Sequence, residues 1–322
     1  MIRTAEEEWV HELGRPLYFL INQSRHHELG IFSPVRAGAA AIVAHLAYCT
    51  ISDEERADVE RATIVPCEAF QRIVRLAASF DIASDLRALD FPDPIIVRTR
   101  RFVALGFPAG ADLHIGIRGT VGAYDWGLNL RVWPRRSPDL PLYFHRGFLS
   151  EATALAEELS TSIAAHRSVS SLERVFLHGH SLGGAIAAII QQRRVLLPFK
   201  QQALGDSKSG DCYVFGAPRT VWRHRQSFSE HSFAIRRSED IVPRIPPATL
   251  GYESFEQQLR TDGSPFLDRG LLDFWPFLKW IDALTFGKFI EGHSMERYRR
   301  EVVSLAAEDP DVARYWPKEI QT

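Results

Sequence analysis

The stretch VFLHGHSLGGAIAAII, residues 175–190, joins a strand-like run directly to a helix-like run. Branched and aromatic residues precede Gly179, as in a buried strand, and small and apolar residues recur at helical spacing after Ser181. The junction, Gly179-His180-Ser181-Leu182-Gly183, is a G-x-S-x-G sequence whose glycines remove the Cβ atoms that would clash in a tight turn. The pattern predicts an exposed Ser181 hydroxyl at a helix N-terminus, where N–H groups and the helix dipole favour a developing negative charge.

The composition is that of a globular protein without an evident nucleic-acid partner. The chain has 322 residues, of which 45% are hydrophobic and 24% charged, and its formal net charge is −2. No glycine-rich phosphate-binding motif is present. The side chains of the adjacent pair His26-His27 would diverge on a strand or a helix, so the pair makes a poor metal-ligand set. We therefore expect neither a cofactor nor a metal.

The order of strand-like and helix-like runs predicts an α/β fold. Residues 1–94 look mainly helical and are expected to pack on the core as an N-terminal segment. Residues 95–322 alternate strands with helices, which favours a mostly parallel central sheet flanked by helices. The first two strand-like runs, residues 95–107 and 112–119, are joined by PAGA and are expected to form an antiparallel hairpin.

A serine nucleophile needs a histidine base within hydrogen-bonding reach and an acid that orients the histidine. In proteins whose serine lies on such a strand–turn–helix junction, the acid follows the serine in the sequence and the histidine follows the acid. Asp240 comes shortly after the strand-like run HSFAIRR and before three stiffening prolines, and Glu239 beside it is the rival. His293 is the only histidine after Asp240. The other candidate acids are Asp206, Asp211, Asp262 and Asp268.

Two donors are also needed for the oxyanion of a tetrahedral intermediate. The backbone N–H of Leu182, directly after the nucleophile, should supply the first. The second should come from an earlier strand end, and the sequence RGT supplies one. There Gly119 allows close backbone approach, and Thr120 can offer its N–H.

Seven motifs, in this order, resemble those of the class 3 lipases, a fungal-lipase-like branch of the α/β-hydrolases. They are IRGT at 117–120, DW at 125–126, FHRGF at 144–148, GHSLGGA at 179–185, VFGAPR at 214–219, DIVPRIPP at 240–247 and HSMERY at 293–298. The resemblance covers roughly residues 95–300 and implies an α/β-hydrolase catalytic domain in the second part of the chain. It also implies a triad of Ser181, Asp240 and His293, with Asp240 preferred over Glu239, and an oxyanion hole of Thr120 and Leu182.

Two apolar stretches are candidates for the wall of an acyl-chain pocket. The first follows the oxyanion residue and carries Trp126, Leu130 and Trp133, and the second, residues 264–292, carries Trp280. The second stretch could equally be a helix buried on the core. A wall of this kind would suit a lipid ester, and with it a lipid–water interface.

These observations predict a triacylglycerol-type lipase. The alternatives are a phospholipase A1, a short-chain esterase, and a lipase-like protein that binds without turnover. Acyl transfer to an alcohol instead of water also remains open, because both reactions share the acyl-enzyme. The oligomeric state is left open.

The location of the protein is predicted from its N-terminal sequence. The stretch MIRTAEEEWVHELG is acidic and lacks the apolar core of a secretory signal, and no run reaches the ~20 apolar residues of a membrane span. The three cysteines show no disulfide pattern and are expected to be buried apolar residues. These features favour a cytoplasmic protein.

Overall fold

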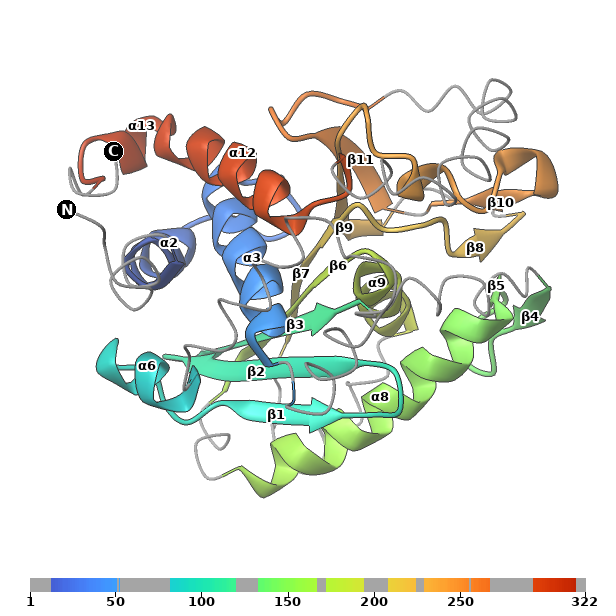
Figure 1. The fold of residues 1–322 in the computed structure, drawn as a ribbon, viewed down its shortest axis with the longest axis horizontal. Coiled ribbons are helices and arrows are strands. Elements are labelled where there is room, and N and C mark those ends of the chain that lie inside the picture. Colours follow the sequence, from blue (N-terminus) through green and yellow to red (C-terminus); the bar gives the residue numbers. More distant parts are fainter. Residues whose placement is uncertain are drawn as a thin grey trace, which may run out of the picture.

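The computed structural model describes residues 13–50, 52, 82–119, 133–166, 172–193, 208–223, 229–254, 256–266 and 292–316. Within them a seven-stranded sheet forms the centre of the molecule (Figure 1). Its order is β1-β2-β3-β6-β7-β9-β11. The strands are β1 (Ile95–Arg98), β2 (Val103–Ala109), β3 (Asp112–Arg118), β6 (Arg174–His180), β7 (Lys208–Phe215), β9 (Ser229–Arg236) and β11 (Glu256–Arg260).

The central sheet is mostly parallel. β3, β6, β7, β9 and β11 pair in parallel, whereas β1 and β2 form an antiparallel edge. Parallel strands need helices on the sheet faces, and the chain supplies them on both. The predicted α/β-hydrolase architecture, a mostly parallel sheet flanked by helices, is confirmed.

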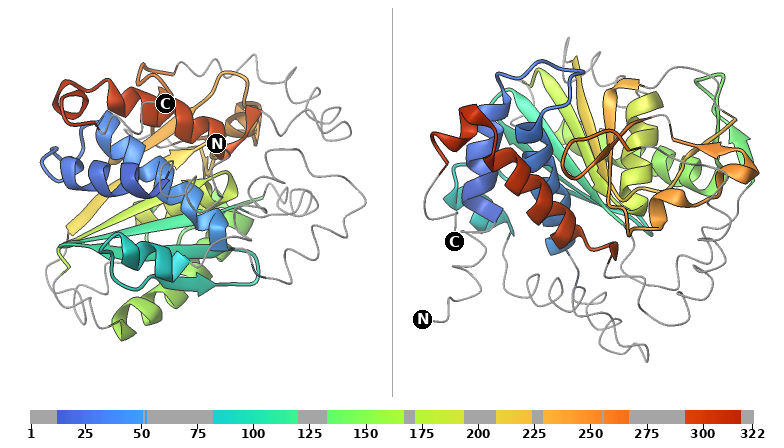
Figure 2. Two further views of the ribbon diagram at one scale, coloured as in Figure 1. Left: turned by 60° about the vertical axis from the view of Figure 1, so that its left-hand side comes forward. Right: turned by 90° about the horizontal axis from the view of Figure 1, so that it is seen from above.

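The helices lie in two layers on opposite faces of the sheet (Figure 2). On one face, α8 (Arg146–Ala165) and α9 (Leu182–Arg193) pack on inward residues of β3, β6 and β7. On the other, α2 (Arg15–Ser24), α3 (Pro34–Leu46) and α12 (Met295–Ala307) cover β2, β7 and β9. Successive side chains of a strand point to opposite faces of the sheet, so alternate residues of each strand pack in different hydrophobic cores. The short helical elements are η2 (Ala47–Thr50), α6 (Ile82–Ala88), η5 (Val242–Arg244), η6 (Ala248–Leu250) and α13 (Pro310–Ala313).

A smaller antiparallel sheet lies beside the central one (Figure 1). Its order is β10-β8-β5-β4. The strands are β4 (Pro134–Arg136), β5 (Tyr143–His145), β8 (Val221–Trp222) and β10 (Tyr252–Glu253). Strands of two or three residues are too short to show an alternating pattern, so the sequence did not predict this sheet.

The run at 95–107 was expected to form one strand, but the structure divides it into β1 and β2. Thr99 accepts a backbone hydrogen bond from Phe102 through its Oγ1 at 3.1 Å and donates its own N–H to the Phe102 carbonyl at 2.9 Å. These bonds close a tight turn between β1 and β2. The predicted antiparallel pairing across PAGA is confirmed, since β2 and β3 pair through a turn in which Gly110 has φ +62°.

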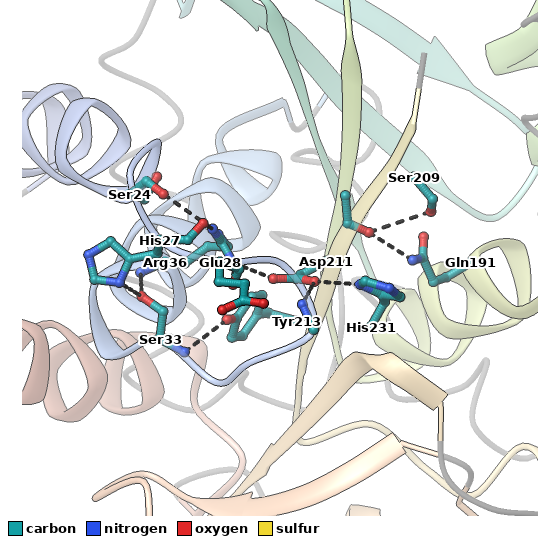
Figure 3. Close-up of polar contacts among 12 residues, drawn as sticks. Ser24, His27, Glu28, Ser33, Arg36, Gln191, Ser209, Asp211, Tyr213 and His231 are labelled. Carbon is teal, nitrogen blue, oxygen red and sulfur yellow. Dashed lines mark hydrogen bonds and ion pairs between the residues drawn. The ribbon is translucent and has the colours of Figure 1, made fainter. Parts of the chain in front are cut away.

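The N-terminal helices are joined to the sheet by a buried ion pair. The guanidinium of Arg36 on α3 contacts the carboxylate of Asp211 on β7, and both side chains are almost fully buried (Figure 3). The same carboxylate accepts from the backbone N–H of Gly30 at 2.9 Å and lies 3.0 Å from Nδ1 of His231. Asp211, a candidate acid in the sequence, is therefore engaged in this contact. The boundary at residue 94 stays a prediction.

Two further sequence expectations bear on the described residues. Cys49 and Cys212 are buried free thiols, as expected, and Cys67 lies outside the described residues. None of the helices within the described ranges is long and apolar enough to cross a membrane.

Candidate active site

Ser181 sits in the turn between β6 and α9. Its φ is +59°, a left-handed conformation that costs a non-glycine residue energy. The strain is held in place by backbone bonds: the Ser181 N–H donates to the Phe215 carbonyl at 2.9 Å, and the Ser181 carbonyl accepts from Ala185 at 3.2 Å. The strand–serine–helix geometry expected from the sequence is present, but Ser181 is buried and not exposed as predicted.

The two glycines of the motif are required by close backbone approach. A Cβ on Gly179 would lie 2.6 Å from the Gly183 carbonyl oxygen. A Cβ on Gly183 would lie 2.2 Å from the Ile117 carbonyl oxygen. Both distances are below any real Cβ contact, so a side chain at either position would force β6, α9 or β3 apart.

Asp240 and His293 form a buried pair. Nδ1 of His293 lies 2.8 Å from Oδ2 of Asp240, and both side chains are buried. The same Oδ2 accepts from the Tyr298 hydroxyl at 2.7 Å, and Oδ1 accepts from the Val242 N–H at 2.9 Å. Three donors thus hold the carboxylate, which leaves the imidazole oriented with its Nδ1 toward the acid.

Glu239, the rival acid, is placed differently. Its side chain is about half exposed and forms an ion pair with Arg237. Arg237, which is buried, also contacts Glu301 at 2.9 Å, so Glu239 belongs to a charge network centred on Arg237. Of the two neighbouring carboxylates, the structure brings only Asp240 to His293.

Gly216 links the acid–base pair to the serine turn. It follows Phe215, whose carbonyl binds the Ser181 N–H, and its φ of +57° is left-handed. A Cβ there would lie 2.7 Å from Oδ2 of Asp240 and 3.0 Å from Cε1 of His293. The imidazole of His293 also packs on His180, with ring centroids 4.6 Å apart. The Asp240–His293 pair therefore packs against Gly216 and against His180, the residue before Ser181.

Burial sets the protonation of the groups around this pair. It lowers the pKa of His180 well below its usual value, and the neighbouring His293 lowers it further, so the His180 ring is neutral. Burial, with the Asp240 carboxylate, raises the pKa of Tyr298 well above its usual value. Tyr298 therefore keeps its proton and acts as a donor to Asp240.

Leu182 is the first residue of α9 and is buried. The first N–H groups of a helix have no partner within the helix, so the position suits a donor to an oxyanion. Thr120, Trp126, Leu130 and Trp280 lie outside the described residues. Trp133 is described and is 75% exposed. The oxyanion and substrate-wall roles stay predictions.

Sequence reasoning missed Gly216 and Tyr298 as site residues. Both lie within motifs that were recognised, VFGAPR and HSMERY. The glycine after a buried strand was a usable signal, because such glycines mark close approach or left-handed backbone. Tyr298 lies five residues after His293 on α12, and only the folded helix shows that its hydroxyl turns back to Asp240.

Comparisons with known proteins match this region. The family model described as "Lipase (class 3)" matches residues 114–250. The secreted mono- and diacylglycerol lipase 1 of Fusarium solani is 25% identical over 165 residues, which are 49% of this chain and 46% of that protein. The lipase of Rhizomucor miehei is 28% identical over 195 residues, 58% of this chain and 51% of that protein. The secreted mono- and diacylglycerol lipase LIP2 of Malassezia restricta is 26% identical over 201 residues, 59% of each.

The chain spans about half the length of the first two of these relatives. The expectation of a cytoplasmic location is wrong, because two of the three relatives are named as secreted proteins.

The matched region contains the end of β3, the Ser181 turn and Gly216, and it includes Asp240, to which His293 is bound. With this geometry and these relatives, residues 114–250 are similar to the class 3 lipases.

Proposed function

We propose that the protein is a serine carboxylester hydrolase that acts on lipid esters, with Ser181 as nucleophile, His293 as base and Asp240 as orienting acid. One observation carries the proposal: the buried Asp240–His293 pair packs against Gly216, whose neighbour Phe215 binds the Ser181 backbone. A strained serine at a helix N-terminus, beside a histidine held by a carboxylate, is the arrangement that acyl transfer requires.

The proposed reaction has two halves. Nε2 of His293 removes the Ser181 hydroxyl proton as Oγ attacks the ester carbonyl, and Asp240 stabilises the resulting imidazolium. The oxyanion is bound by the N–H groups of Leu182 and Thr120. His293 then protonates the departing alcohol. Water, activated by the same base, hydrolyses the acyl-enzyme and restores Ser181.

The proposed substrates are acylglycerols, reached at a lipid–water interface. Two relatives are named as mono- and diacylglycerol lipases, which supports this substrate class. The proposed acyl wall includes Trp126, Leu130, Trp133 and Trp280. A phospholipase A1 and a short-chain esterase share the chemistry and differ only in substrate. A lipase-like protein that binds without turnover would keep the fold and lack the reaction.

Initial rates on p-nitrophenyl esters of increasing acyl length test the substrate class, with Ser181→Ala as the control for contaminating esterases. We expect kcat/KM to rise with acyl length, since each buried methylene contributes about 0.8 kcal/mol at most. A steady fall beyond acetate would indicate a short-chain esterase. Emulsified triacylglycerol and phospholipid vesicles, compared at equal interfacial area, then separate a lipase from a phospholipase A1.

A serine-directed fluorophosphonate tests the nucleophile without any assumption about substrate. We expect one label per chain, located on Ser181, and complete loss of esterase activity. Folded protein that takes up no label would favour the binding protein. Label on another serine would place the active site elsewhere.

A further inference from the structure

Tyr48 of η2 reaches the serine turn from the N-terminal helical segment. Its hydroxyl lies 2.7 Å from Nδ1 of His180, the residue that precedes Ser181, and both side chains are buried. The two rings meet edge to face with centroids 5.7 Å apart. Tyr48 lies outside the region 114–250 that matches the family model, so this contact is supplied by a part of the chain beyond the match.

Tyr48 also touches the strand end that leads to the proposed oxyanion residue. The backbone of Gly119 forms a hydrogen bond with the Tyr48 hydroxyl. A Cβ on Gly119 would lie 3.4 Å from that hydroxyl and 3.2 Å from the Cβ of Ser181. One phenol group thus joins Gly119, which follows β3, to the end of β6, and Thr120 and Ser181 are the next residues in the sequence after these two contacts.

The direction of the Tyr48–His180 hydrogen bond follows from protonation. Burial raises the pKa of Tyr48, so its hydroxyl keeps the proton. Burial lowers the pKa of His180 well below its usual value, so the ring is neutral and carries one acceptor nitrogen. The Tyr48 hydroxyl therefore donates to Nδ1, and the ring proton of His180 is on Nε2.

The His180 ring, fixed by its hydrogen bond with Tyr48, packs against the imidazole of His293. Its centroid lies 4.6 Å from that of His293, with 30° between the ring planes. The hydroxyl of Tyr48 contacts both this ring and the Gly119 backbone before Thr120. It does not touch the reacting atoms.

We propose that Tyr48 is a positioning residue for ester hydrolysis. Its hydroxyl sets the separation between the end of β3 and the serine turn, and it fixes the His180 ring, which packs against His293. The proposal rests on the proposed function. It predicts a defect in the chemical step: Tyr48→Phe should lower kcat roughly 10-fold to 100-fold with little change in KM, because small displacements of oriented groups are costly in the transition state.

Tyr213→Phe is the matched control. Tyr213 is also a buried tyrosine whose hydroxyl joins the N-terminal segment to the sheet, through the Ser33 N–H at 3.3 Å. It contacts neither His180 nor Gly119 in any hydrogen bond of the described residues. Both variants should lose comparable stability in urea, but only Tyr48→Phe should lose kcat. Equal kcat losses in the two variants would overturn the proposal.

The experiment measures kcat, KM and the rate of fluorophosphonate labelling for the wild type, Tyr48→Phe, Tyr213→Phe and Ser181→Ala. A wild type without activity or labelling refutes the proposed function. An active wild type with a Tyr48→Phe variant of equal kcat and equal labelling rate refutes only the role of Tyr48.

A double-mutant cycle, with kcat expressed per active site titrated by the fluorophosphonate, keeps the test decisive if Tyr48→Phe folds poorly. His180→Leu removes the acceptor, so adding Tyr48→Phe should then cost less in kcat than it does in the wild type, because only the Gly119 contact remains to be lost. Independent, multiplying losses in kcat would show that Tyr48 does not act through His180, and would overturn the proposal.

Discussion

The hydroxyl of Tyr298 donates at 2.7 Å to the same Asp240 oxygen that lies 2.8 Å from Nδ1 of His293. This shared oxygen makes Tyr298 part of the support of the acid–base pair. Tyr298→Phe removes one of three donors to the carboxylate and keeps the ring packing. We expect kcat to fall about 10-fold, with Asp240 still present to orient His293. Steady-state kinetics on a p-nitrophenyl ester measures this, and an unchanged kcat would contradict the supporting role.

Loss of the negative charge should lower kcat much more at Asp240 than at its neighbour Glu239. Asp240→Asn should lower kcat on the order of 10⁴-fold, as a triad acid does when its carboxylate is removed. Glu239→Gln should leave kcat within about 3-fold of the wild type, because the half-exposed Glu239 side chain pairs with Arg237 and not with His293. Comparing kcat of the two variants shows which of the two carboxylates orients His293. A severe Glu239→Gln defect beside a mild Asp240→Asn defect would reverse the assignment.

Gly216→Ala should inactivate the protein through a steric clash. The new methyl group would lie 2.7 Å from Oδ2 of Asp240, on a backbone with φ +57°. We expect kcat to fall at least about 100-fold as the acid–base pair is displaced. Gly251→Ala is the control, because Gly251 also has a left-handed φ of +84° but its nearest neighbour is Trp222.

Both glycine variants should lose about 1–2 kcal/mol in the free energy of unfolding, from the left-handed backbone alone. Urea unfolding measures that loss, and an ester assay separates the two positions. If both variants keep wild-type kcat, the Gly216 backbone does not limit the position of His293.

The parts of the site that were predictable are those encoded by neighbouring residues. The serine turn could be recognised because its strand, glycines and helix lie within sixteen residues, 175–190. The pairing of Asp240 with His293 depended on chain order and on the family resemblance, which preferred Asp240 over Glu239. The structure places these two side chains together, as expected.

What could not be predicted depends on contacts between distant segments. Tyr48 and His180 are 132 positions apart, and Tyr298 and Asp240 are 58 apart. No local pattern encodes such distances. The turn between β1 and β2 was missed for a different reason: Thr99 makes it with a side-chain hydrogen bond, without the glycine or proline that usually marks a turn.

The Arg36–Asp211 pair should be important for stability and not for chemistry. Asp211→Asn leaves the buried Arg36 guanidinium without its counter-charge, and breaking a buried pair in this way costs about 3–5 kcal/mol. Urea unfolding should show this loss, whereas kcat of the folded fraction should be unchanged, because the hydrogen bonds of Asp211 go to Arg36, Gly30 and His231 (Figure 3). Asp262→Asn, an exposed carboxylate bonded to Ser264, should change stability little. Equal effects of the two variants would contradict the role of the buried pair.

The free energy of unfolding should decrease at acid pH in part because of His114, which is fully buried in a stack of aromatic rings. Its ring lies between Phe107 and Phe176, at centroid distances of 6.0 and 4.9 Å. Burial, with smaller contributions from nearby arginines, lowers its pKa to about 3. Because this folded-state pKa lies below the unfolded value of about 6.5, the unfolded chain binds a proton first as the pH falls. The stability contributed by neutral His114 is therefore present above about pH 6.5 and is lost progressively down to about pH 3.

His114→Phe tests this by keeping an aromatic ring in the stack and removing the titrating group. Between pH 7 and pH 5 the wild type should lose about 2 kcal/mol more of its free energy of unfolding than the variant, since each pH unit below the unfolded pKa contributes about 1.4 kcal/mol. The variant also loses the 3.3 Å contact with His178, so it is the change with pH, not the absolute stability, that is compared. His26→Gln, an exposed histidine, should follow the wild type. Parallel pH curves for the wild type and His114→Phe would mean that His114 takes up its proton equally in the folded and unfolded chains.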